Sequence, residues 1–110
     1  VFGGAGCLST HWPGTALQPH ADNPSPDAFV AYLRAHAPAL AGHRVYFDHG
    51  TATLDAMYAP TQQRVDQLFR ARGYTNADFR SAVSPGAAHT EDAWAARLDQ
   101  PMTFLLPPRR

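Results

Sequence analysis

The 110-residue sequence contains no lysine, only one cysteine and no apolar run long enough to span a membrane. Its nine arginines are balanced by nine acidic residues, so it lacks the positive charge that nucleic-acid-binding domains carry. A single cysteine cannot form an internal disulfide, and no Cys or His pair has the spacing of a structural zinc site. We therefore predict no metal, no nucleic-acid partner and no membrane partner.

The remaining composition is that of a globular domain, with 45% hydrophobic and 16% charged residues. The chain opens at Val1 without an initiator methionine or the features of a signal peptide. It closes with prolines at 107 and 108, which end an apolar stretch. We therefore expect residues 1–110 to be the C-terminal portion of a single, longer domain. Whether that protein is cytoplasmic or exported stays open, because a signal peptide would lie in the upstream part.

Hydrophobic periodicity and turn residues predict three strands that alternate with three helices. The strands are expected at 5–9, 44–48 and 79–83, and the helices at 26–37, 60–72 and 90–98. Ser25 and Thr90 are the expected N-caps, and Gly73 is the expected helix stop. Residues 18–26 read as a loop, and residues 101–106 as a closing segment.

The connections between the strands are long enough for crossovers, which favours parallel pairing and an α/β layer fold. Parallel sheets are normally covered on both faces, and three strands alone would leave a long parallel edge exposed. We therefore expect more of the sheet to lie upstream of Val1.

Polar segments follow each predicted strand, at residues 9–12, 48–55 and 84–91. Catalytic groups gather at the carboxyl ends of parallel strands. An acid after the second strand and His89 after the third fit two members of a hydrolase triad, in which histidine transfers a proton and a carboxylate orients it. From the residues alone, Asp48 and Asp55 are both candidates for the acid, and His89 could instead be an ordinary loop histidine.

Two runs carry a resemblance to a known family, namely YFDHGTATLDAMY at 46–58 and GAAHTEDAWAARL at 86–98. They resemble the esterase family of α/β-hydrolases that includes enterochelin-esterase-like and esterase-D-like enzymes, and residues 1–6 and 9–12 extend the match over nearly the whole chain. The resemblance implies a three-layer α/β-hydrolase sandwich that hydrolyses carboxylic esters through a serine and requires no cofactor. It implies Asp55 as the triad acid, His89 as the triad base, and a small-molecule or carbohydrate-linked ester as the substrate.

The sequence departs from this family in one respect, because it contains no Gly-x-Ser-x-Gly nucleophile elbow. Ser9, Ser25, Ser81 and Ser84 do not match that motif. We therefore expect the nucleophile, and the oxyanion donors that accompany it, in an upstream segment of the same protein, and we expect this chain alone to be inactive. The alternatives are acyl transfer to a sugar or another alcohol on the same fold, and a non-catalytic α/β binding module.

Two further residues are candidates for substrate binding. His11 and Trp12 follow the first strand, where they could line an apolar acyl or alcohol pocket, with simple packing as the alternative. We expect Trp94 and Arg97 to pack or pair within the fold, and Cys7 to be a small buried residue of the first strand.

Overall fold

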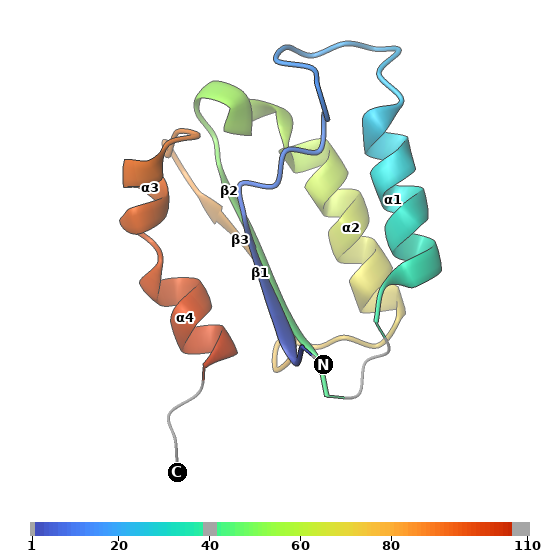
Figure 1. Cartoon of the computed structure of the whole chain (residues 1–110), viewed down its shortest axis with the longest axis vertical. Helices are drawn as coiled ribbons and strands as arrows, with labels where there is room; N and C mark the ends of the chain where they lie inside the picture. Colours follow the sequence, from blue (N-terminus) through green and yellow to red (C-terminus); the bar gives the residue numbers. More distant parts are fainter. Residues whose placement is uncertain (1, 39–41, 107–110) are drawn as a thin grey trace.

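A three-stranded parallel sheet lies between two layers of helices in the computed structural model (Figure 1). The structure describes residues 2–38 and 42–106. The strands are β1 (Gly4–Leu8), β2 (Arg44–Gly50) and β3 (Phe79–Ser84). The helices are α1 (Ser25–His36), α2 (Ala59–Ala71), α3 (Glu91–Ala95), α4 (Asp99–Leu105) and the 3₁₀ helix η1 (Thr53–Met57). The prediction of an α/β fold with three parallel strands is therefore confirmed.

The strand order is β1-β2-β3, so both crossovers between the described strands connect neighbours in the sheet. Leu8 lies opposite Asp48 in the first ladder, and Asp48 lies opposite Ala82 in the second. Because all three strands run in the same direction, their carboxyl ends meet at one edge of the sheet (Figure 1). The segments that follow the strands therefore come together at this edge, which is where the candidate site lies.

The hydrophobic core lies between the sheet and the layer formed by α1 and α2. Side chains of β2 alternate, so Phe47 points into this core and contacts Phe69 and Phe79, while Tyr46 points to the opposite face. The buried members of the core are Trp12, Val30, Val45, Phe47, Tyr58, Val65, Phe69, Tyr74 and Phe79. This core holds β2 in the middle of the sheet.

Helix α4 covers the other face of the sheet, together with α3 (Figure 1). It packs closely on β1, because a Cβ added at Gly6 would lie 3.0 Å from a methyl carbon of Leu105. Arg44 also donates a hydrogen bond to the carbonyl of Phe104. The glycines of β1 thus permit the close approach of α4.

Most predicted elements agree with the structure to within two residues, but the predicted C-terminal helix is too long. The predicted helix 90–98 ends at Ala95, and a separate helix, α4, begins at Asp99 and includes most of the segment 101–106, for which the sequence predicts no secondary structure. Pro101 lies in the first turn of α4, where a missing N–H group breaks no helical hydrogen bond. Pro107 and Pro108, which are expected to end the last apolar stretch, lie outside the described residues.

Of the three expected helix signals, two agree with the structure. The Thr90 hydroxyl accepts a hydrogen bond from the Ala93 N–H group and caps α3, and Gly73 has φ 93° just after α2. Ser25 does not cap α1 with its side chain, since it is the first helical residue. Its own N–H group donates to Asn23 Oδ1 instead, in a local side-chain turn.

Within residues 2–38 and 42–106, no helix is both long enough and apolar enough to cross a membrane.

Candidate active site

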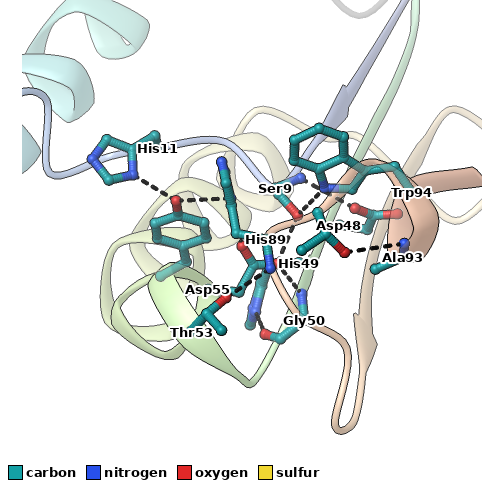
Figure 2. Close-up of polar contacts among 12 residues, drawn as sticks. Ser9, His11, Asp48, His49, Gly50, Thr53, Asp55, His89, Ala93 and Trp94 are labelled. Carbon is teal, nitrogen blue, oxygen red and sulfur yellow. Dashed lines mark hydrogen bonds and ion pairs between the residues drawn. The ribbon is translucent and has the colours of Figure 1, made fainter. Parts of the chain in front are cut away.

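Asp55 and His89 lie in contact at the carboxyl edge of the sheet, with 2.8 Å between Oδ1 and Nδ1 (Figure 2). Asp55 belongs to η1, just after β2, and His89 lies in the loop between β3 and α3. The carboxylate of Asp55 is fully buried, whereas 23% of the His89 side chain is exposed. The parallel sheet thus brings together two residues that the sequence predicts to be a catalytic acid and base.

The second oxygen of Asp55, Oδ2, accepts two further hydrogen bonds. The Ser9 hydroxyl and the Gly50 N–H group each donate to it at 2.6 Å. Burial alone would raise the pKa of Asp55, but the hydrogen bonds from Ser9, Gly50 and His89 outweigh it and lower that pKa. Asp55 is therefore ionised at neutral pH, and an ionised carboxylate can only accept hydrogen bonds.

The acceptor role of Asp55 assigns the proton positions on the imidazole of His89. Nδ1 must carry a hydrogen to donate to Asp55, which leaves Nε2 unprotonated in the neutral ring. This outer nitrogen points away from Asp55 (Figure 2) and has no hydrogen-bond partner among the described residues. Trp94 supports the ring edge-on, with 5.0 Å between ring centroids. The imidazole therefore presents a free basic nitrogen.

Asp48, the other candidate acid, is engaged elsewhere. Its carboxylate receives hydrogen bonds from Arg97 Nε at 2.9 Å and from Arg97 Nη2 at 3.0 Å, and also one from the Tyr46 hydroxyl. Both partners of this ion pair are buried, and hydrogen bonding to Asp48 raises the pKa of Arg97. Because Arg97 neutralises Asp48, the geometry favours Asp55 as the acid that serves His89.

His11 lies beside His89, with 6.1 Å between ring centroids. Its Nε2–H group donates to the carbonyl of Ala16, so in the neutral ring Nδ1 accepts a hydrogen bond from the Tyr58 hydroxyl. The distance between Nδ1 and the Tyr58 oxygen is 2.5 Å. The Tyr58 oxygen then faces His89 Nδ1 at 3.2 Å as a second acceptor. Burial, followed by the charge of Asp55, raises the pKa of Tyr58 to about 12, so its hydroxyl stays neutral.

Trp12, the second candidate for substrate binding, is a core residue. Only 3% of it is exposed, and its ring packs between Phe29 and Phe47. Its indole N–H group donates to Gln62 Oε1. The geometry supports the packing alternative, so His11 alone of this pair lies at the site.

A cavity lies next to η1. Its volume of about 300 Å³ is within the usual size range of small-molecule sites. The loop after β1 and the start of α2 line it, with Met57, His20 and Asn23 among the lining residues. Among the described residues, no group of three or more His, Cys, Asp or Glu side chains is arranged to hold a metal ion.

Sequence reasoning missed four residues of the site, namely Ser9, Gly50, Tyr58 and Trp94. The sequence excludes Ser9 as an elbow nucleophile and assigns it no other role, and it predicts Trp94 to pack or pair within the fold. A local signal existed for Ser9 and Gly50, because each lies at the carboxyl end of a strand. Cys7, in contrast, lies on β1 as expected, although it is only partly buried, and burial raises the pKa of its thiol.

We expect Gly50→Ala to disrupt the site, because an added Cβ would lie 2.0 Å from the carbonyl oxygen of Ala87. That oxygen accepts hydrogen bonds from the N–H groups of Thr51 and Ala52, which fix the loop that carries His89. Steric overlap of this kind costs roughly 1–3 kcal/mol or more. Urea unfolding should show that the free energy of unfolding falls by at least about 1 kcal/mol relative to the parent protein.

Gly3→Ala is the matched control, since its Cβ would meet no atom closer than 3.8 Å. We expect this variant to unfold like the parent protein. Equal stability of the Gly50→Ala and Gly3→Ala variants would contradict the close packing of the Ala87 carbonyl against β2.

Comparisons with known proteins found no relative of this chain. It matches no family model, no curated protein and no solved structure. The resemblance to the esterase family therefore stays a prediction from the sequence. Any function must be argued from the chemistry of the site.

Proposed function

We propose that this chain supplies the acid and the base of a serine-type carboxylic ester hydrolase with the α/β-hydrolase fold. The observation that carries the proposal is the contact between Asp55 and His89. A buried, ionised carboxylate holds Nδ1 of the imidazole, and Nε2 points outward without a partner among residues 2–38 and 42–106. This is the arrangement that acyl transfer through a serine requires.

In the proposed reaction, a serine hydroxyl attacks the carbonyl carbon of the ester while His89 Nε2 takes its proton. The C–O bond to the alcohol then breaks, and the leaving alcohol takes that proton from Nε2. Water attacks the acyl-serine and passes a proton to Nε2, which returns it to the serine oxygen as the carboxylic acid leaves. Asp55 stays ionised throughout and stabilises the imidazolium that forms twice in the cycle.

The proposal places the nucleophilic serine upstream of Val1. No Gly-x-Ser-x-Gly elbow occurs in the 110 residues. Ser9, which lies beside the pair, donates its hydroxyl hydrogen to Asp55 and not to His89 Nε2. The substrate is proposed to be a small-molecule or carbohydrate-linked ester, and the chemistry requires no cofactor.

Hydrolysis of 4-nitrophenyl acetate and butyrate by the complete protein tests the proposal. We expect repeated turnover with release of nitrophenol and the free acid. A sugar or glycerol added as an acceptor separates hydrolysis from acyl transfer, because transfer would yield a new ester in place of the acid. If the complete protein shows neither reaction with these esters, the proposal is wrong and a non-catalytic binding module is the better account.

A further inference from the structure

Two residues with an unusual backbone conformation flank the Asp55–His89 pair. Ser9 has φ 49° and Thr53 has φ 53°, and among the described residues they are the only non-glycine residues with positive φ. L-residues rarely adopt this left-handed region, and a β-branched residue such as threonine is especially unfavourable there. Backbone strain of this kind clusters at functional sites. Glycine would adopt this conformation without steric cost, so serine and threonine at these positions require a physical explanation.

The Ser9 hydroxyl is saturated with hydrogen bonds. Its oxygen accepts from Trp94 Nε1 at 2.9 Å and from Arg97 Nη2 at 2.8 Å. Both of these groups are donors only, so they direct the single hydroxyl hydrogen to Asp55 Oδ2, 2.6 Å away. Ser9 is buried, and its backbone N–H group donates to the carbonyl oxygen of Asp48. The left-handed turn at the end of β1 thus aims this hydroxyl at the candidate acid.

Thr53 acts on the other member of the pair. It is the first residue of η1, and its Oγ1 accepts a hydrogen bond from the backbone N–H group of His89 at 2.8 Å (Figure 2). This bond ties the loop that carries His89 to the 3₁₀ helix that carries Asp55. Each strained residue therefore uses its hydroxyl to hold one member of the pair.

We propose that Ser9 and Thr53 are positioning residues, whose hydroxyl groups fix Asp55 and His89 relative to each other. Their catalytic effect rests on the proposed ester hydrolysis, whereas their effect on geometry does not. If only the turns mattered, glycine would suit both positions better, because it adopts positive φ without steric cost. The hydrogen bonds of the hydroxyl group at each position therefore outweigh the steric cost of the left-handed backbone.

The test compares glycine with hydroxyl-bearing variants in the complete protein. Ser9→Gly and Thr53→Gly relax the backbone and remove the hydroxyl, whereas Thr53→Ser keeps the hydroxyl without the β-branch. We expect Ser9→Gly to lower kcat roughly 10- to 100-fold and Thr53→Gly roughly 3- to 10-fold, with little change in KM. Thr53→Ser should retain the parent kcat.

Thermal unfolding separates positioning from a general structural role. We expect both glycine variants to stay folded at the assay temperature, with Thr53→Gly closest to the parent Tm, because backbone relief offsets only part of the three hydrogen bonds that the Ser9 hydroxyl makes. Ser81→Ala is the matched control, because it removes a hydroxyl of β3 that donates to Asp66 Oδ2 at 2.9 Å. This variant should have the parent kcat. Glycine variants with the parent kcat, or with a loss that the Ser81→Ala variant shares, would overturn the proposal.

NMR of ¹⁵N-histidine-labelled protein supplies a readout that needs no activity. The Nδ1–H proton of His89 should give a downfield signal in the parent protein and in the Thr53→Ser variant. It should broaden or be lost by exchange with water in the Ser9→Gly variant. An unchanged signal in Ser9→Gly would overturn the positioning role of Ser9, whereas failure of the parent protein to hydrolyse any ester would overturn the proposed function alone.

Discussion

Replacing His89 with alanine is expected to lower kcat for ester hydrolysis by roughly four to six orders of magnitude. The variant lacks the imidazole whose unprotonated nitrogen faces outward from Asp55, so the part of the chain that the structure describes offers no other base there to take the proton of the attacking serine. KM should change little, because the imidazole acts on the reacting atoms more than on substrate binding. Steady-state kinetics on 4-nitrophenyl acetate would measure both constants.

His36→Ala is a suitable control for this variant. His36 is exposed near the end of α1 and contacts the ring of Tyr32, away from the site. We expect it to retain the parent activity. A His89→Ala variant that also retains that activity would show that His89 is not the base, whatever its contact with Asp55.

Asp55→Asn is expected to lower kcat by roughly four orders of magnitude without unfolding the protein. The structure dictates how the new amide would be oriented. Oδ2 accepts hydrogen bonds from Ser9 and Gly50, so the asparagine oxygen must take this position. Its NH₂ group then faces His89 Nδ1 and donates to it, which forces the ring hydrogen onto Nε2. An imidazole in that tautomer cannot accept a proton from serine.

The control for Asp55→Asn is Asp66→Asn, which makes the same chemical change elsewhere in the protein. Asp66 also accepts two side-chain hydrogen bonds, from Gln62 and Ser81, but it lies on α2 away from His89. Kinetics and thermal unfolding of both variants should show lost activity only for Asp55→Asn. Similar kcat values for the two variants would mean that Asp55 does not orient the base.

The sequence was sufficient for features with a local signal. The β-branched and aromatic run at 44–48 predicts β2, and a threonine just before an acidic first turn predicts that Thr90 caps α3. The order of an acid and then a histidine after successive strands also placed Asp55 and His89 at the same edge, because parallel strands end together. These inferences depend on short segments and on a general property of parallel sheets.

Features that depend on distant contacts could not be predicted in this way. Asp48 pairs with Arg97 49 residues further along the chain, and no local pattern marks that partnership. Trp12 looked like a pocket residue because it follows a strand, but the aromatic side chains of α1 and β2 bury it. Whether a side chain at a strand end faces the core or the site depends on tertiary packing, which a single sequence does not display.

Labelling of the complete protein with a fluorophosphonate tests the central claim most directly. This reagent phosphonylates a serine whose hydroxyl is activated by a neighbouring base, so it reports on the nucleophile and on His89 together. We expect one phosphonyl group per chain, mapped by peptide mass spectrometry to a serine upstream of Val1, and much slower labelling in the His89→Ala variant. Labelling of Ser9, or labelling that proceeds equally fast without His89, would contradict the account.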